Sequence, residues 1–135
     1  MIVLKFGGTS VANAQNIKLV IEIVAKKAQN DRLAVVVSAF SGVTDLLLKT
    51  SNEAALKNES YLTTLEEIKQ KHFETITNLV AKKNQNDLLV TITNEIKQLK
   101  TLLDGCFLIG ELSPRTSDAI VSFGELLSSQ IIAVA

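Results

Sequence analysis

The sequence predicts an α/β fold that is rich in helix, and three observations support this prediction. Two β-prone runs, Ile2–Phe6 and Leu33–Val37, flank a segment whose apolar residues recur with helical spacing. Two longer apolar stripes of helical period follow between about residues 60 and 112. Polar loops follow both predicted strands, and open α/β sheets bind ligands outside the carboxyl ends of their strands.

The composition is that of a globular protein without an excess of charge. Hydrophobic residues make up 47% of the chain, and 14 Lys and Arg balance 14 Asp and Glu. This balance leaves no net field to attract nucleic acid or an anionic membrane surface. The amino-terminal run carries Lys5 and lacks the apolar core of a signal peptide, and no uninterrupted apolar stretch is long enough for a bilayer. Nucleic-acid and membrane partners are therefore disfavoured, and a cytoplasmic location is expected.

The first third of the chain predicts a right-handed β-α-β unit. The first strand, Ile2–Phe6, ends at a pair of glycines. Asn13 is the expected N-cap of a helix that ends near residue 30. The continuous apolar run Leu33–Val37 predicts a strand buried on both faces of a parallel sheet. The expected apolar face of the helix consists of Ile17, Val20, Ile21, Val24, Ala25 and Ala28.

A helical hairpin is predicted at about residues 60–112, after a helix that runs to about Leu56. Thr64 and Glu67 match a capping box, and the polar run of residues 84–87 is expected to separate the two helices. The stripes predict an antiparallel pair, which we interpret as scaffold. His72 is predicted to lie in the hairpin interface rather than to bind metal, and Cys106 to be a buried, unreactive thiol. The stripes are Leu65, Ile68, His72, Ile76, Leu79 and Val80, then Leu88, Leu89, Ile92, Ile96, Leu99, Leu103 and Cys106.

A last helix is predicted after Ser113-Pro114, with Ser117 as its N-cap and Gly124 interrupting its apolar line. The apolar pattern continues to Ala135, while only two strands are predicted, too few for a stable open sheet. We therefore expect residues 1–135 to be the truncated amino-terminal half of a larger catalytic domain.

The loop after the first strand has the features of a phosphate-binding loop. Gly7 and Gly8 follow the strand and precede a helix, so that backbone N–H groups are free to face an anion while Lys5 supplies a positive charge. The Walker and dinucleotide-binding spacings are both absent. From the pattern alone, a simple tight turn remains the alternative.

The second loop and the last helix offer further polar groups. If the strands are parallel, the loop at residues 38–45 emerges beside the glycine loop, and hydroxyls of Ser38, Ser41 and Thr44 are suited to a carboxylate or phosphate. The pattern alone favours simple helix capping by these hydroxyls. Glu125 follows Gly124 in an apolar helix, where a ligand or backbone can approach closely. The pattern alone favours a simpler interpretation, in which Glu125 is an exposed helix residue and Gly124 packs against another segment.

These motifs together resemble those of aspartate kinases of the amino acid kinase family. Residues 5–12, KFGGTSVA, are similar to the signature that opens these enzymes. Residues 38–45, SAFSGVTD, resemble their second loop, and residues 122–128, SFGELLS, resemble their Gly-Glu helix. The resemblance covers the chain end to end, with the hairpin matching only in kind. Residues 11–14 also resemble the bifunctional aspartokinase–homoserine dehydrogenases.

The resemblance implies the amino-terminal part of a three-layer αβα fold and a phosphotransferase reaction. The γ-phosphoryl group of ATP, bound with Mg²⁺, is transferred to the side-chain carboxylate of L-aspartate, giving 4-phospho-L-aspartate for lysine, threonine and methionine biosynthesis. This carboxylate, with a pKa of ~3.9, is already ionised at neutral pH and needs no general base. A homo-oligomeric parent enzyme is expected.

The resemblance also implies a role for each matching residue. Lys5 is expected to be catalytic, offsetting charge on the transferring group between the ATP phosphates and the acceptor. The expected phosphate contacts are Lys5, Gly7, Gly8 and Thr9. Ser38 and Thr44 are expected to hold aspartate, and Glu125 to pair with its α-ammonium group. No residue is implied as a metal ligand, and residues 1–135 alone are expected to be inactive, because the family's adenine-binding loops lie further along the chain.

Two alternatives remain open at this point. Another amino acid kinase acting on glutamate, acetylglutamate, carbamate or UMP has a similar glycine-loop design. A non-catalytic module, in which the helical hairpin binds a partner and the glycine loop is only a turn, is the second alternative.

Overall fold

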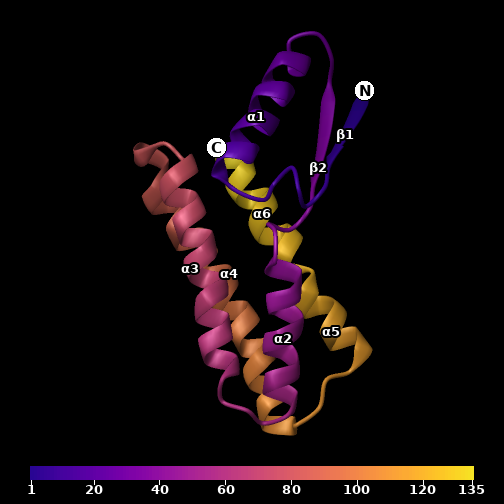
Figure 1. The fold of residues 1–135 in the computed structure, drawn as a ribbon, viewed down its shortest axis with the longest axis vertical. Coiled ribbons are helices and arrows are strands. Elements are labelled where there is room, and N and C mark those ends of the chain that lie inside the picture. Colours follow the sequence, from indigo (N-terminus) through magenta and orange to yellow (C-terminus); the bar gives the residue numbers. More distant parts are fainter.

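The computed structural model describes residues 1–135 and has two strands and six helices (Figure 1). The predicted α/β, helix-rich fold is confirmed. In chain order the elements are β1 Ile2–Phe6, α1 Ala14–Ala28, β2 Leu33–Val37, α2 Val43–Ala55, α3 Tyr61–Leu79, α4 Lys82–Ile109, α5 Pro114–Val121 and α6 Phe123–Val134.

The strands form a parallel two-stranded sheet at one end of the molecule, as predicted. Ile2 pairs with Leu33 and Phe6 with Val37, and α1 and α6 both contact β2. The prediction that Leu33–Val37 is buried on both faces was wrong. Val3 is 64% and Val36 49% exposed, because both helices pack against the other face of the sheet.

Helix α1 follows the predicted pattern at its start. The side chain of Asn13 accepts a hydrogen bond from the backbone N–H of Asn16 at 2.8 Å, as expected of an N-cap. Ile17 and Val20 of the predicted apolar face are buried, whereas Ala25 and Ala28, further along, are exposed. The amino-terminal half of α1 therefore anchors the helix to the rest of the protein.

The antiparallel helical hairpin of α3 and α4 is confirmed, but its helix boundaries differ from the prediction. Helix α3 begins at Tyr61, and Thr64, the expected N-cap, is buried inside it with its hydroxyl donating to Glu53 of α2 at 2.6 Å. The chain turns at Val80 rather than at residues 84–87, which belong to the first turns of α4. The side-chain amide of Gln85 donates to the carbonyl oxygen of Val80 at 2.9 Å and so satisfies the end of α3.

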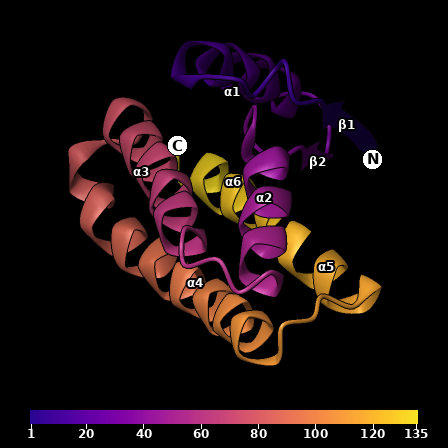
Figure 2. The ribbon, with the colours of Figure 1, turned by 60° about the horizontal axis from the view of Figure 1, so that its bottom comes forward.

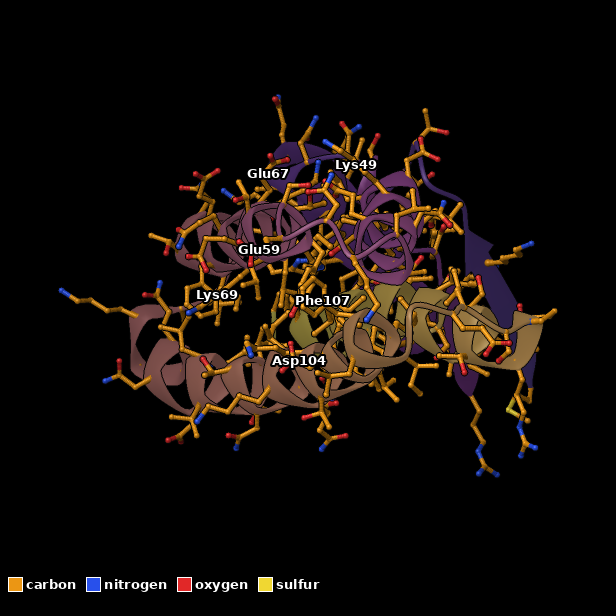
Figure 3. The ribbon with its side chains drawn as sticks, turned by 90° about the horizontal axis from the view of Figure 1, so that it is seen from below. Lys49, Glu59, Glu67, Lys69, Asp104 and Phe107 are labelled. Carbon is orange, nitrogen blue, oxygen red and sulfur yellow. The ribbon has the colours of Figure 1, made fainter.

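A partly buried polar corner holds the far end of the hairpin together. The Tyr61 hydroxyl donates to Asp104 at 2.7 Å, and its ring stacks on Phe107 with 5.2 Å between ring centroids. Figure 3 shows Asp104 and Phe107 on the side of α4 that faces α3. Burial, together with the hydrogen bond to Asp104, raises the pKa of Tyr61 to about 12. The ring, its hydroxyl and the carboxylate thus fix α3 to α4 at one place.

The last predicted helix is two helices. Ser113, rather than Ser117, is the N-cap of α5, since its hydroxyl accepts from the N–H of Thr116 at 3.1 Å and Pro114 occupies the first helical position. Pro114–Val134 is long and apolar enough to cross a membrane, with a mean hydropathy of 1.2. The helix is instead interrupted at Ser122, and Ile120 and Leu127 are fully buried in the protein. One third of the apolar window is buried, and this part packs into the core.

The core lies among the helices, and it brings α6 to the carboxyl end of the sheet. Helix α6 is surrounded by α2, α3, α4 and α5 (Figure 2). Leu47, Leu99 and Ile131, from α2, α4 and α6, have no exposed surface. The starts of α2 and α6 lie where β2 ends (Figure 1), which places two helix beginnings beside the glycine loop.

Candidate functional site

Lys5 is the second-last residue of β1 and pairs with Val36 of β2. Its side chain is exposed on the sheet face that no helix covers. The only ion pair in the protein joins Lys100 to Asp104, so the Lys5 ammonium group has no acidic partner. Lys5 is therefore a fixed, unneutralised positive charge at the end of a strand.

The loop after Lys5 presents unpaired backbone donors. The N–H of Ser10 donates to the Gly7 carbonyl at 3.1 Å, and the Asn16 amide donates to the Thr9 carbonyl at 3.1 Å. These bonds fold the loop and leave the N–H groups of Gly7, Gly8 and Thr9 without a partner in the protein. Unpaired N–H groups beside a lysine form a site suited to an oxyanion.

The second loop also leaves its donors free. Helix α2 begins after Gly42, whose φ of 80° is left-handed and which has no side chain to cap the helix. The prediction of hydroxyl capping was wrong, because Ser38, Ser41 and Thr44 make no hydrogen bond to this helix end. The N–H groups of Thr44 and Asp45 are unpaired. An uncapped helix start carries partial positive charge and favours an anion.

Helix α6 is held against the second loop at two points. A Cβ built at Gly124 would lie 2.8 Å from the Cβ of Ala39, so only glycine permits this approach. The Ser128 hydroxyl donates to the carbonyl oxygen of Ser38 at 2.7 Å. Glu125, one helical turn before Ser128, is exposed and unpaired. The predictions of a close approach at Gly124 and of an exposed glutamate beside it are both confirmed.

Ser38 is the common neighbour of the three segments. A Cβ built at Gly8 would lie 3.9 Å from the Ser38 hydroxyl oxygen, and the N–H of Ser38 donates to the Phe6 carbonyl at 3.1 Å. The structure thus brings together the glycine loop, the start of α2 and the Gly124–Ser128 turn. Their polar groups lie on an open surface, since none of the surface hollows is lined by Lys5, Ser38 or Glu125.

Comparison with known proteins agrees with this arrangement over the whole chain. Residues 1–135 match the model of the amino acid kinase family. The chain belongs to the amino acid kinase family. It is 36% identical over 129 residues to bifunctional aspartokinase/homoserine dehydrogenase 1 of Arabidopsis thaliana, covering 96% of this chain and 14% of that protein. It is 35% identical to the aspartokinase of Candida albicans, covering 94% of this chain and 24% of that protein.

The fold of this amino acid kinase chain is also that of part of a solved enzyme. Escherichia coli aspartokinase III, in complex with lysine and aspartate, superimposes with a TM-score of 0.83 at 31% identity. The match covers 98% of this chain and 28% of that one. The chain therefore spans between about a seventh and about a quarter of the relatives it matches. The resemblance to aspartate kinases is confirmed.

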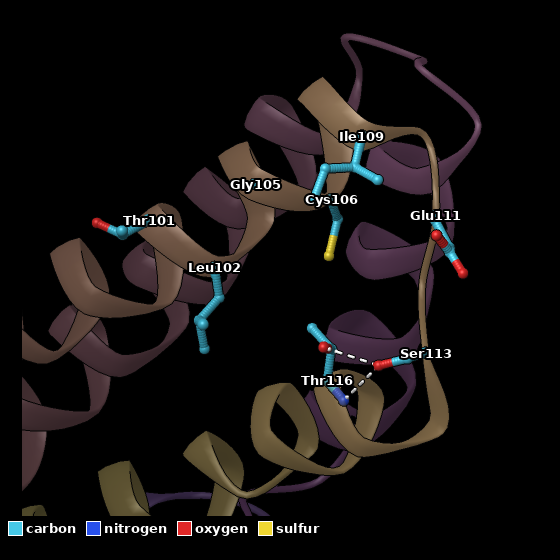
Figure 4. Close-up of a pocket in the computed structure, with 8 residues that line it drawn as sticks. All are labelled: Thr101, Leu102, Gly105, Cys106, Ile109, Glu111, Ser113 and Thr116. Carbon is cyan, nitrogen blue, oxygen red and sulfur yellow. Dashed lines mark hydrogen bonds between the residues drawn. The ribbon is translucent and has the colours of Figure 1, made fainter.

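A hollow of about 340 Å³ lies away from this site, between the end of α4 and the start of α5 (Figure 4). Two of its polar side chains are paired with each other, because the Ser113 hydroxyl donates to the hydroxyl of Thr116 and accepts from its N–H. Cys106 points into it, and burial raises the pKa of this thiol, which keeps it protonated. The lining residues are Thr101, Leu102, Gly105, Cys106, Ile109, Glu111, Ser113 and Thr116.

Sequence reasoning missed that α3 of this kinase chain touches the second loop. His72 is buried as predicted, but its ring lies against Phe40, with 5.4 Å between ring centroids. A Cβ built at Gly42 would lie 3.8 Å from the Lys71 ammonium nitrogen. No local pattern signals contacts between residues some thirty positions apart.

We expect acid to destabilise the protein through His72, its only histidine. Burial lowers the pKa of His72 below the usual histidine value of ~6.5, and the nearby Lys71 charge acts in the same direction. The unfolded chain therefore binds the proton more readily than the folded one. The free energy of unfolding is highest above the usual histidine pKa and falls as the pH drops below it. The expected slope is up to about 1.4 kcal/mol per pH unit.

Urea unfolding at about pH 7.5 and about pH 5.5 measures this effect. The His72→Asn variant is the control, since its side chain does not titrate in this range. Equal pH dependence in both proteins would contradict the assignment to His72.

Proposed function

We propose that this chain is the amino-terminal portion of an aspartate kinase, which transfers the γ-phosphoryl group of ATP to the side-chain carboxylate of L-aspartate to give 4-phospho-L-aspartate. The observation that carries the proposal is the meeting of three segments at Ser38 in a chain that resembles aspartokinases throughout. Escherichia coli aspartokinase III has been solved with aspartate and ADP, which supports a carboxylate acceptor and a nucleotide donor.

Lys5 and the glycine loop bind the phosphoryl group in this proposal. Phosphoryl transfer requires mainly positioning and compensation of charge on the oxygens of the transferring group. The unpaired ammonium group of Lys5 provides that charge, and the free N–H groups of Gly7, Gly8 and Thr9 donate to phosphate oxygens. Mg²⁺ enters with the ATP phosphates rather than through a cluster of acidic side chains of this chain.

The second loop and α6 hold the acceptor. The free N–H groups at the start of α2, with the hydroxyls of Ser38 and Thr44, suit a carboxylate. Glu125 has no partner in the protein and is the anionic group suited to the α-ammonium of aspartate. The bound carboxylate is ionised at neutral pH, so the enzyme has to orient it and does not have to deprotonate it.

The remainder of the enzyme lies outside these 135 residues in this proposal, since the chain covers 28% of aspartokinase III. That remainder supplies the adenine site, so residues 1–135 alone are inactive. The complete enzyme is a cytoplasmic homo-oligomer that starts lysine, threonine and methionine biosynthesis.

A coupled assay of ADP formation by the full-length protein tests the acceptor. We expect saturation with aspartate and no turnover with glutamate, acetylglutamate or UMP. Glu125→Gln should raise the KM for aspartate tenfold or more, because a hydrogen bond to a charged group is worth about 1.5–3 kcal/mol. Glu66→Gln, at an exposed glutamate on α3, is the matched control. Saturation by glutamate in place of aspartate would overturn the proposal.

A further inference from the structure

We propose that His72 is a positioning residue for the aspartate-binding loop: from α3 it holds Phe40, and through Phe40 it sets the place of Ser38 and of the first turn of α2. This inference rests on the proposed function, because it concerns the same loop. His72 does not touch the substrate in this proposal.

Phe40 is the large side chain by which the second loop is anchored in the core. It is 3% exposed, while Ser41 and Gly42, which follow it, are exposed. Its carbonyl oxygen accepts from the N–H of Val43 at 3.0 Å, which starts α2. A shift of the Phe40 ring is therefore transmitted to Ser38 on one side and to Thr44 on the other.

The ring of His72 is fixed in orientation and cannot be replaced freely. Its Nδ1 lies 2.6 Å from the carbonyl oxygen of Ile68, one turn earlier in α3. A carbonyl only accepts, so Nδ1 carries the proton and the ring is held at one angle against Phe40. Figures 1 and 2 both show α3 beside α2.

The other ring nitrogen indicates that packing alone does not account for His72. Nε2 is buried without a hydrogen-bond partner, and His72 has no exposed surface. A buried acceptor without a partner lowers stability, whereas an apolar side chain of similar size does not. Lys71, the preceding residue, reaches the same loop at Gly42. The pair therefore forms a second support of the loop, in addition to Ser128 of α6.

Steady-state kinetics of the full-length protein test this role. We expect His72→Ala to lower kcat/KM for aspartate by about 10- to 100-fold, because small displacements of binding groups have effects of this size. The KM for ATP should change by less than about twofold, since no hydrogen bond joins the glycine loop to α3. His72→Asn should recover part of the loss, because its amide nitrogen can replace Nδ1 as the donor to Ile68.

Two further variants separate positioning from general loss of packing. Ile92→Ala removes an equally buried side chain from α4, and it should lower stability without changing the KM for aspartate. Phe40→Ala should reproduce the effect of His72→Ala, and the double variant should be no worse than either single one. Additive losses, or an equal rise in the KM for aspartate in Ile92→Ala, would overturn the inference.

The test also separates this inference from the proposed function. If the unaltered protein does not use aspartate, the proposed function fails. If it uses aspartate and His72→Ala has normal kcat/KM, only the positioning role fails.

Discussion

Replacing Lys5 by alanine in the full-length protein is expected to lower kcat by about 10³-fold or more, because in the proposed reaction its charge acts on the transition state. Lys5 is exposed and makes no ion pair, so the fold does not depend on it. Aspartate-dependent ADP formation measures the loss, and circular dichroism checks that the helices remain.

Lys26→Ala is the matched control for this substitution. Lys26 is also an exposed lysine, but it lies in the last turn of α1. Its removal should leave kcat within about twofold, as for most surface substitutions away from a site. Near-normal turnover of Lys5→Ala would remove this residue from the mechanism, whatever the behaviour of the control.

Replacing Gly124 by alanine is expected to destabilise the protein by about 1–3 kcal/mol, the usual effect of overpacking a core. The new Cβ would lie 2.8 Å from the Cβ of Ala39 and 3.4 Å from a methyl group of Leu47. Ala39 has no flexible side chain with which to yield, so the start of α6 has to move away from the second loop. Urea unfolding measures the change in the free energy of unfolding.

Gly105→Ala provides the opposite result within the same fold. Gly105 lies inside α4, and a Cβ built there meets nothing within 4 Å. Alanine favours the helix by about 1 kcal/mol over glycine, so this variant should be more stable than the unaltered protein. Adding Ala39→Gly to Gly124→Ala should restore part of the lost stability, since it removes the clashing atom. A loss of similar size in both single variants would contradict the close approach at Gly124.

Much of the fold was predictable because hydrophobic spacing reports burial directly. Both strands and the helical hairpin were found from it, and the buried faces of α3 and α4 are those of the predicted stripes. The predicted helix boundaries were wrong where a polar side chain has a hydrogen-bond partner that is distant in sequence. Thr64 matches an N-cap but bonds Glu53 on another helix, and Gln85 matches a breaker but caps the preceding helix. Such partners are not visible in a local pattern.

The candidate site was predictable to the extent that it follows from parallel strands. That rule placed the loops after β1 and β2 at one edge, and the structure has Gly8 beside Ser38. The hydroxyls of the second loop were expected to cap α2, but left-handed Gly42 starts the helix without them. The contact of His72 with Phe40 was missed, because it depends on how α3 packs against that loop.

The hydrogen bond between Ser128 and Ser38 joins residues 90 positions apart, which bears on when the site can assemble. Closing so long a loop has an entropic cost, which is offset only by the contacts that form once α6 has packed. During synthesis, both polar loops leave the ribosome long before α6 does. A nascent chain that ends before residue 122 would therefore have every unpaired N–H group of the glycine loop, yet lack the helix that holds Ser38 in place.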